Sequence, residues 1–548
     1  MNMRSRILLA LIALAFLTLR VPGLELPLHQ DEYKWPMIVN PETNYGTNIP
    51  HPPLSQFLYQ TGGAIVGYDV HLRMVPLFFG FLNLLLLFVW LRMRAGERAA
   101  LWGAILFAFS FHSILASLMV DTDGQIMPFF LLLALIAYER ARTDARWWSL
   151  VALVCVLGFL VKTSFILAIG ALAADWLWER RSLLVTRAAL FYAGTALLLA
   201  TALALVLLVV QYVFPFFDLA KSLVYWKHFI STDHNWFQVA IQVVKAAFYL
   251  SPLLVLLPLW GTRDIFERVR PLVFFTVFGL LFYLVIFDFS VGALDRYLQF
   301  LVIPLVSFAA VYLAQSVDVA RYRVLALVGC IAALGLVALQ FVPHTVPSLY
   351  PKAAWIGRIL SLQWDMLYPF SGGSGPLTFY VSFLVIGASW LFSAGIIALG
   401  WWRRALRPAL LLVLLPVTFV YSAIFSEEYL MGKVNGYAPG LVARAAAHIA
   451  ADASITRVVV YNDNGGDEVR RTGKYEKRLY TSPDFDWRDK TQTMNEFRGH
   501  YLVVDAPPID PASIFAKHFA TCIPVYQDSD RYMHATIYDC RQAPPLVL

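Results

Sequence analysis

The chain has 548 residues, of which 59% are hydrophobic and only 14% are charged. Soluble domains carry about 45–50% apolar and about 25% charged residues, so this composition excludes a purely soluble protein and requires a lipid environment. The net charge of +7 does not indicate nucleic-acid binding, because the arginines gather in short loops between apolar runs.

Apolar runs long enough to cross a membrane recur along the chain. A bilayer-spanning helix needs about 20 apolar residues, with a range of about 17–25. The fifth and sixth runs lie end to end around Lys162, and two interpretations stay open: two short helices that meet inside the membrane, or one long helix. The sequence predicts an α-helical polytopic membrane protein with about thirteen transmembrane helices. The predicted spans are 7–22, 72–91, 99–119, 125–141, 148–162, 163–179, 188–211, 246–261, 271–289, 297–314, 324–343, 376–401 and 406–425.

Arginines occur on alternate sides of these spans. Short loops rich in Lys and Arg stay in the cytoplasm. Groups of arginines precede the first span and follow every even-numbered span from the second to the twelfth. In chain order the groups are Arg4 and Arg6; Arg92, Arg94 and Arg98; Arg140, Arg142 and Arg146; Arg180, Arg181 and Arg187; Arg263, Arg268 and Arg270; Arg321 and Arg323; and Arg403, Arg404 and Arg407. This pattern predicts a cytoplasmic (inner) membrane protein with its N-terminus inside and its C-terminal segment outside.

The same topology predicts two domains. Residues 1–425 form a transmembrane catalytic domain, whose larger outer loops are 23–70, 212–245 and 344–375. After residue 425 charged residues occur throughout, which indicates a soluble segment.

Residues 426–548 have the pattern of a small soluble α/β domain outside the membrane. A helical pattern covers 438–452, and the apolar runs at 457–461 and 501–505 are typical of buried strands. The residues Asn462 to Gly466 form a predicted turn.

Two adjacent carboxylates, Asp31 and Glu32, follow the first span within the segment Leu28–Trp35. A partly desolvated carboxylate beside the membrane suits a general base that removes a proton from an attacking hydroxyl group. Adjacent residues of an extended loop point opposite ways, so we expect one to face the reaction and the other to hold the loop or the acceptor. An isolated Asp-Glu pair is more often a solvated loop pair, so this interpretation depends on the surrounding motifs.

Further motifs surround this pair in a fixed order. Arg20-x-x-Gly23 precedes it, His51-Pro52-Pro53-Leu54 follows it, and Leu72-Arg73 begins the second span. Proline suits the first turn of a helix, so residues 52–62 are predicted to form a short helix along the membrane. In this order the motifs resemble the protein O-mannosyltransferase and aminoarabinose transferase group of the glycosyltransferase C superfamily.

Two later segments extend the resemblance. Val120-Asp121-Thr122-Asp123-Gly124 forms the second outer loop and precedes Phe129-Phe130, and the group typically carries an acidic residue there. Asp295-Arg296-Tyr297-Leu298 is similar to an Arg/Lys-Tyr segment of the group at the outer end of a later span. The resemblance covers residues 1–165 well and the remainder weakly.

The resemblance implies transfer of a sugar from a polyprenyl-phosphate lipid on the outer face of the membrane. Asp31 would deprotonate the acceptor, whose hydroxyl oxygen then attacks the anomeric carbon and inverts it. Lys34, Arg73 and Arg296 would bind the phosphate of the departing lipid, Arg through two parallel bonds and Lys as a point charge. The implied partners are the polyprenyl-phosphate-linked sugar donor, membrane lipids and an acceptor lipid or glycan, with no nucleic acid.

The sequence departs from this group in two places. Aminoarabinose transferases carry Glu-Lys-Pro where this chain has His51-Pro52-Pro53, so a phosphate-binding lysine is missing there. Protein mannosyltransferases usually carry a large β-rich domain in a middle loop, and this chain has no comparable insert. A lipid or glycan acceptor is therefore favoured over a protein.

Several ionisable residues are candidates for a supporting role. Asp123 matches the group in its spacing to the following phenylalanines, and Asp121 either supports the site or caps the next helix. Lys162 either pairs with an acid inside the helical bundle or extends to the interface. His51 and Tyr297 complete the set of supporting candidates.

No cofactor is firmly implied by the sequence. His29 and His51 flank the carboxylates, so a divalent-metal site is one interpretation, but a hydrogen-bonding role is favoured for both. The cysteines lack the spacing of a zinc site. For Cys522 and Cys540 a disulfide and two free buried thiols both stay open.

A lipid flippase or transporter is the alternative function, because the composition permits it equally. Transporters are expected to show halves with related hydropathy and broken helices in matching positions, and no such pairing is visible. Most of the outer-side candidates also lie in loops or at helix ends, where an interfacial transferase needs them. A third alternative, an inactive relative that binds a glycolipid, is disfavoured by the intact Asp31, Lys34 and Arg73.

Overall fold

The computed structural model describes residues 3–43, 52–181, 201–202, 204–213, 218–230, 234–287, 297–316, 323–348, 352–370, 376–479 and 487–545. By compactness the chain divides into two units, each assembled from separate segments. Unit 1 comprises Met1–Leu24, Lys34–Tyr322 and Ile397–Leu411, and unit 2 comprises Glu25–Tyr33, Arg323–Ile396 and Leu412–Leu548. The predicted domain boundary at residue 425 follows chain order and stays a prediction.

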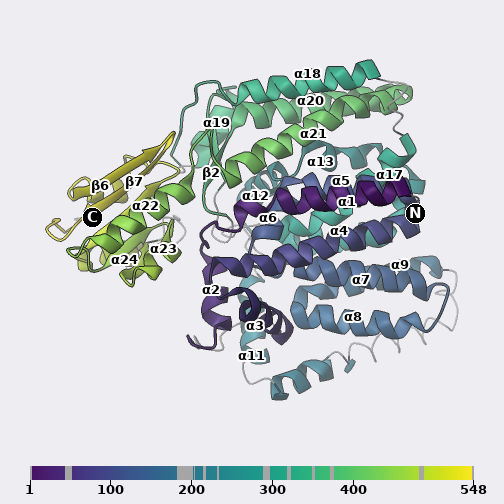
Figure 1. Cartoon of the computed structure of the whole chain (residues 1–548), viewed down its shortest axis with the longest axis horizontal. Helices are drawn as coiled ribbons and strands as arrows, with labels where there is room; N and C mark the ends of the chain where they lie inside the picture. The colour runs from purple at the N-terminus through teal and green to yellow at the C-terminus, as the bar shows by residue number, and fades with distance from the viewer. Residues whose placement is uncertain are drawn as a thin grey trace. The chain divides into compact units, whose positions relative to one another are not determined.

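The described part of unit 1 is mostly helical (Figure 1). Helix α2 (Asp31–Val39) begins in unit 2 and ends in unit 1. The α-helices of unit 1 are α1 (Met3–Thr18), α3 (Pro53–Val66), α4 (Met74–Ala95), α5 (Glu97–Phe109), α6 (Phe111–Leu118), α7 (Ile126–Ala141), α8 (Trp147–Val161), α9 (Ile166–Glu179), α11 (Leu219–Phe229), α12 (Trp236–Phe248), α13 (Pro252–Leu256), α14 (Arg263–Arg268), α15 (Arg270–Leu281) and α17 (Val302–Ser316). Tighter or wider single turns are η1 (Val21–Gly23), η2 (Val70–Arg73), η3 (Thr163–Phe165), η5 (Leu257–Trp260), η6 (Phe282–Ile286), η7 (Leu298–Leu301) and η8 (Arg404–Leu406).

The described helices confirm a multi-pass membrane protein. Five of them are long and apolar enough to cross a membrane, and two bent pairs raise the number to seven. The five are Met3–Gly23, Val70–Ala95, Leu298–Ser316, Phe383–Trp402 and Arg404–Leu430. The predicted total of thirteen stays a prediction.

Two of the predicted spans contain a break in the helix. Within 99–119, α5 and α6 meet at 63°, and around 246–261 the chain bends by 119° between α12 and the helix that begins at Pro252. Apolar composition is the same for a straight and a broken helix, so hydropathy cannot distinguish them. Proline explains the second break, since it lacks the N–H that would continue the helix. Of the two interpretations around Lys162, the structure has two short helices, α8 and α9.

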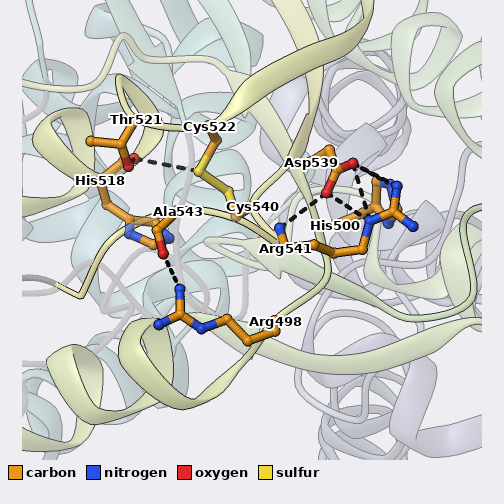
Figure 2. Close-up of a disulfide and its surroundings, with 9 residues drawn as sticks. All are labelled: Arg498, His500, His518, Thr521, Cys522, Asp539, Cys540, Arg541 and Ala543. Carbon is orange, nitrogen blue, oxygen red and sulfur yellow. Dashed lines mark hydrogen bonds and ion pairs between the residues drawn. A yellow bond between two sulfur atoms is a disulfide. The ribbon is translucent and has the colours of Figure 1, made fainter.

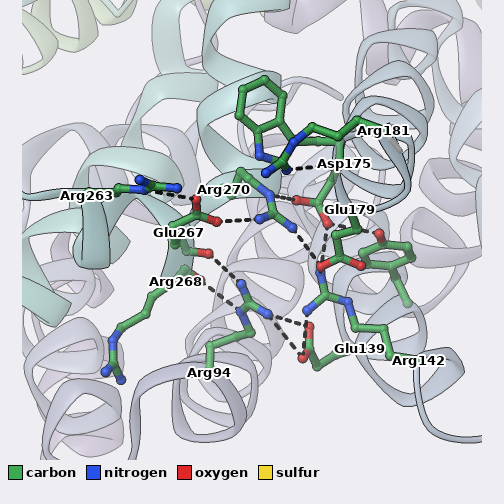
Figure 3. Close-up of polar contacts among 12 residues, drawn as sticks. Arg94, Glu139, Arg142, Asp175, Glu179, Arg181, Arg263, Glu267, Arg268 and Arg270 are labelled. Atoms are coloured by element: carbon green, nitrogen blue, oxygen red, sulfur yellow. Dashed lines mark hydrogen bonds and ion pairs between the residues drawn. The ribbon is translucent and has the colours of Figure 1, made fainter. Parts of the chain in front are cut away.

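Charged side chains from the ends of several helices form one network at one end of unit 1 (Figure 3). The Asp175 carboxylate is fully buried, and it accepts hydrogen bonds from Arg142 at 2.9 Å and from Arg270 at 2.5 Å. Arg94 donates to both oxygens of Glu139 at 3.2 Å. The members come from the ends of α4, α7, α9, α14 and the start of α15, so the loops after the second, fourth, sixth and eighth predicted spans meet at the same end. That is the arrangement that the alternating arginines predict, whereas the side of the membrane that this end faces stays a prediction.

We expect Asp175→Asn to lower the free energy of unfolding of the membrane domain by about 1.5–3 kcal/mol, because it weakens charged hydrogen bonds from two partly buried guanidinium groups to a fully buried side chain. Thermal unfolding in detergent measures the effect. Asp264→Asn is the control, since Asp264 pairs with Arg268 at 3.0 Å in an exposed position, where a pair contributes at most about 1 kcal/mol. Equal effects of the two substitutions would show that the network adds nothing to stability.

The described part of unit 2 contains helices, a small hairpin and the C-terminal domain. Its first part consists of α18 (Arg323–Leu339), α19 (Lys352–Leu360), β1 (Leu367–Phe370), β2 (Phe379–Ser382), α20 (Phe383–Trp402) and α21 (Arg407–Leu430), although the end of α20 and the start of α21 belong to unit 1. Gly329 allows α18 to approach α21 closely, because a Cβ atom there would lie 2.7 Å from the carbonyl oxygen of Val413. A larger residue at 329 would push the two helices apart.

The C-terminal domain is a five-stranded sheet with helices on both faces, which confirms the predicted small α/β domain. Its strand order is β4-β3-β5-β7-β6, with β3 parallel to β4 and β5 and the other pairs antiparallel. Its elements are α22 (Ala438–Ala451), β3 (Val458–Tyr461), α23 (Gly466–Arg471), β4 (Tyr475–Leu479), α24 (Trp487–Glu496), β5 (His500–Asp505), α25 (Ile514–Phe519), β6 (Ile523–Asp530) and β7 (Met533–Asp539).

Covered faces explain the continuous apolar strands of this domain. Val458 and Val460 pack with α22 in one core, whereas Val459 and Tyr461 pack with residues of α24 and α25 in another. Successive side chains of a strand point to opposite faces, so a strand buried on both sides is apolar at every position.

A disulfide joins Cys522 to Cys540, and it decides between the alternatives that the sequence left open (Figure 2). It ties the start of β6 to the residue after β7, closing a short loop around the edge of the sheet. Nearby, Asp539 accepts hydrogen bonds from Arg541, and this guanidinium lowers the pKa of Asp539 to about 2. Cys155 and Cys330 are free thiols.

Candidate active site

The second outer loop and Lys162 form a buried ion pair in unit 1. Lys162 Nζ contacts Asp123 Oδ2, and both side chains are only 3% exposed. The ammonium group also lies 5.2 Å from the centre of the Tyr297 ring. Of the two interpretations of Lys162, the structure therefore has the pair with an acid inside the bundle. Ionisable groups at membrane depth are costly, and where they persist they are usually functional.

A polar network that the sequence analysis missed holds this loop. The Asn83 amide of α4 donates to the carbonyl and side-chain oxygens of Gln125, each at 2.8 Å. Gln125 in turn donates to Ser117 Oγ at 3.2 Å. Gln125 follows the loop directly, so these contacts join α4, α6 and the loop that carries Asp121 and Asp123. Asn83 was visible as a polar residue within an apolar span, which is the signal that could have found it.

Helix α3 confirms the predicted short helix after Pro52 and links two outer segments. Tyr59 in α3 donates its hydroxyl hydrogen to the carbonyl oxygen of Asp121 at 2.7 Å. The Tyr59 ring also packs on Trp35 of α2, with ring centres 4.7 Å apart. The backbone of Asp121 is thus held by α3, and the role of its side chain stays a prediction.

Two buried arginines contact backbone carbonyls of α1, α5 and α6. Arg73 ends η2, at the head of α4, and its guanidinium donates to the carbonyl oxygen of Leu118. Arg20 donates to the carbonyl oxygens of Phe16 at 2.9 Å and Ala108 at 3.1 Å. Arg20 fixes the end of α5, which explains an arginine at that position.

The segment that carries the two carboxylates is helical, which corrects the expectation of an extended loop. Helix α2 begins at Asp31, and Glu32 Oε2 accepts a hydrogen bond from the backbone N–H of His29 at 3.1 Å. Glu32 is buried, whereas Asp31 is half-buried. Glu32 therefore stabilises the turn, and Asp31 is the better candidate for contact with an acceptor. His29 is also buried here.

The same segment contacts the C-terminal domain within unit 2. Gln30 Nε2 donates to the carbonyl oxygen of Asn462 at 3.5 Å, and the guanidinium of Arg470 lies 3.7 Å from the centre of the Tyr33 ring. Burial raises the pKa of the neighbouring Asp463 carboxyl, and the positive charges of Arg470 and Arg478 oppose that rise. No sequence signal connected these residues to Asp31, because the contact depends on how the tail folds back.

The remaining candidates are less well placed by the structure. Lys34 is exposed on α2. His51 and Arg296 lie outside the described residues, so their predicted roles stay predictions. The structure therefore brings together Asp123, Lys162 and Tyr297 in unit 1 and describes Asp31 and Glu32 in unit 2.

One group of described side chains has the spacing of a metal site. His518, Cys522 and Cys540 place their ligand atoms within 4.8 Å of one another. Both sulfur atoms are joined in the disulfide, however, and the metal ligand of a cysteine is its thiolate. The group therefore offers no metal site in this oxidised form.

His518 makes the stability of the C-terminal domain dependent on pH. Burial, together with the charge of Arg498, lowers its pKa to about 4, and neither ring nitrogen has a hydrogen-bond partner among the described residues. As the pH falls, the imidazole of His518 becomes protonated near pH 6.5 in the unfolded chain but only near pH 4 in the folded chain. Stability is therefore fully present above pH 6.5 and falls as the pH drops toward 4.

We expect His518 to contribute about 1–2 kcal/mol to this acid destabilisation. Hydrogen exchange of the β5 and β7 amides in the full-length protein, between pH 6.5 and 4, measures it. His518→Phe should flatten the dependence, whereas substitution of the exposed His534 by Gln should leave it as in the wild type. A His518→Phe curve parallel to the wild type would contradict the assignment.

Residues 50–212 match the family of dolichyl-phosphate-mannose-protein mannosyltransferases. No curated protein sequence matches the chain. ArnT from Cupriavidus metallidurans in the apo state has the same fold, with a TM-score of 0.54 at 14% identity over 98% of each chain. Its crystal structure bound to undecaprenyl phosphate gives a TM-score of 0.56 at 14% identity over 97% of each chain.

The chain has the glycosyltransferase C fold. This confirms the resemblance that the order of the motifs indicated, and the structural match extends it from the first 165 residues to nearly the whole chain. The matched family segment, residues 50–212, contains Lys162 and the loop with Asp121 and Asp123. It does not contain Asp31 or the C-terminal domain.

Proposed function

We propose that the protein is a membrane glycosyltransferase that moves a sugar from a polyprenyl-phosphate-linked donor to an acceptor lipid or envelope glycan. The observation that carries the proposal is the shared fold with ArnT from Cupriavidus metallidurans over 97% of both chains, in a structure that contains undecaprenyl phosphate. The family match of residues 50–212 supports the same class of donor.

The proposed reaction is a single displacement with inversion. Asp31 takes the proton of the acceptor hydroxyl group while its oxygen bonds to the anomeric carbon, and the bond from that carbon to the phosphate oxygen breaks. The electron pair leaves with the polyprenyl phosphate, whose growing negative charge is stabilised by Lys34, Arg73 and Arg296. Cations placed where charge develops lower the barrier more than they stabilise the bound donor.

The supporting residues are assigned by their contacts. Glu32 stabilises the turn that carries Asp31, since it accepts the N–H of His29. Asp123 holds the Lys162 ammonium group beside Tyr297. Asp121 is held through its backbone by Tyr59. His51 is proposed as a hydrogen-bonding residue near the acceptor.

The proposed orientation places the reaction on the outer face of the cytoplasmic membrane. The loops rich in arginine meet at one end of unit 1, in the network around Asp175, and such loops stay in the cytoplasm. The N-terminus would then be inside, and the C-terminal domain would lie outside, where disulfides form and persist.

The test is an assay of the purified protein, in detergent with native lipids, against radiolabelled polyprenyl-phosphate sugars and an envelope extract. We expect one donor to be consumed, with release of polyprenyl phosphate and transfer of label to a lipid or glycan. NMR of the product should show an inverted anomeric configuration. If no donor is consumed and the protein moves a labelled lipid across liposome membranes, the flippase alternative is correct instead.

A further inference from the structure

The loop after β3 occupies a position where sheets of this kind often bind ligands. From β3 the chain moves to β4 on one side and then returns to β5 on the other, so the carboxyl ends of β3 and β5 form a switch point of the parallel part of the sheet. Ligands of open α/β sheets bind at such points. Here the loop Asn462–Gly465 contacts the protein's own segment at Gln30.

Arg470 is the centre of this contact. Its guanidinium lies between two aromatic rings, 3.7 Å from the centre of Tyr33 and 3.7 Å from the centre of Tyr475. The guanidinium of Arg470 also lies 3.9 Å from Oδ1 of the fully buried Asp463 carboxylate. The guanidinium of Arg478 lies 3.6 Å from the other oxygen, Oδ2. A planar guanidinium stacks on an aromatic face and faces a carboxylate at the same time, which a lysine cannot do.

Unusual backbone conformations occur on both sides of the contact. Gln30, directly before Asp31, has φ of 44°, and Asn462 and Asp463 have φ of 54° and 59°. Residues other than glycine adopt this left-handed region at a cost, and they keep it where the surrounding structure demands it, often at functional sites. The contact is therefore specified by the backbone of both segments.

We propose that Arg470, stacked on Tyr33, is a positioning residue through which the C-terminal domain fixes the first turn of α2 and hence the orientation of Asp31. Tyr33 lies two residues after Asp31 in the same helical turn, and Glu32 closes that turn onto His29. Because Asp31 begins this turn, a contact that fixes the turn also fixes the backbone that carries the Asp31 carboxylate. The proposal rests on the proposed function for its kinetic consequence, but its structural part stands by itself.

Hydrogen exchange of the full-length protein tests the structural part. In Arg470→Lys, the amides of the first turn of α2 should exchange about tenfold faster than in the wild type, because the positive charge remains but the stacking is lost. Arg471→Lys is the matched control, since Arg471 lies in the same helix α23 and pairs with Asp467 at 2.8 Å at the surface. Unchanged exchange in Arg470→Lys overturns the proposal.

Kinetics test the functional part. Arg470→Lys and Tyr33→Leu should lower kcat about 10- to 100-fold with the donor KM unchanged, while Tyr33→Phe, which keeps the ring, should recover most of the rate. In an Asp31→Asn background, Arg470→Lys should cause no further loss, since it acts through Asp31. Additive losses overturn the proposal. If exchange changes as expected but the wild type transfers no sugar, the contact stands and the proposed function fails.

Discussion

Asp31→Asn should lower kcat for sugar transfer by about 10²- to 10⁴-fold, which is the usual contribution of a general base. Asparagine keeps the size and hydrogen-bonding capacity of the side chain but cannot accept the proton of the attacking hydroxyl group. Asp31 is half-buried at the start of α2, where a neutral isostere should leave the fold intact. Initial rates with the identified donor, measured at saturating acceptor, give the effect.

Two control substitutions separate catalysis from structure. Glu42→Gln changes an exposed carboxylate of the same outer loop and should keep the wild-type rate. Glu32→Gln keeps an oxygen that accepts the N–H of His29, so it should lower the rate much less than Asp31→Asn. If Asp31→Asn transfers sugar as fast as Glu42→Gln, Asp31 is not the base.

Lys162→Met should both destabilise the membrane domain by about 3–5 kcal/mol and abolish most sugar transfer. The substitution removes the ammonium group that pairs with the buried Asp123 carboxylate. Thermal unfolding in detergent gives the stability, and the donor assay gives the activity.

The double variant Asp123→Asn/Lys162→Met distinguishes a structural from a functional pair. Replacing both charges removes the unpaired carboxylate, so stability should recover most of the loss caused by Lys162→Met alone. Activity should stay low, because the site would still lack its ammonium group. If the double variant recovers both stability and activity, the pair only supports the fold. If the losses of stability from the two substitutions add, the two residues do not interact.

Several features that depend on local sequence were confirmed. Five of the predicted apolar runs form helices long and apolar enough to cross a membrane, which needs about 20 such residues. Helix α3 begins at Pro53, as a proline-led helix should, and the strands β3 and β5 follow from their runs of valine and other apolar residues. The order of short motifs was sufficient to indicate the fold.

Features that join distant segments were decided only by the tertiary structure. The sequence contains Asp123, Lys162, Cys522, Cys540, Tyr33 and Arg470, but composition and periodicity carry no information about which of them meet. The bends at Ser110 and Pro252 were missed because a broken helix has the same hydropathy as a straight one. The extended conformation expected around Asp31 was wrong for a related reason, since the turn is stabilised by Glu32 and by a domain more than 400 residues later in the chain. Hydrophobicity and turn chemistry act over a few residues, whereas the position of Asp31, the proposed base, depends on packing between segments that only the folded chain brings together.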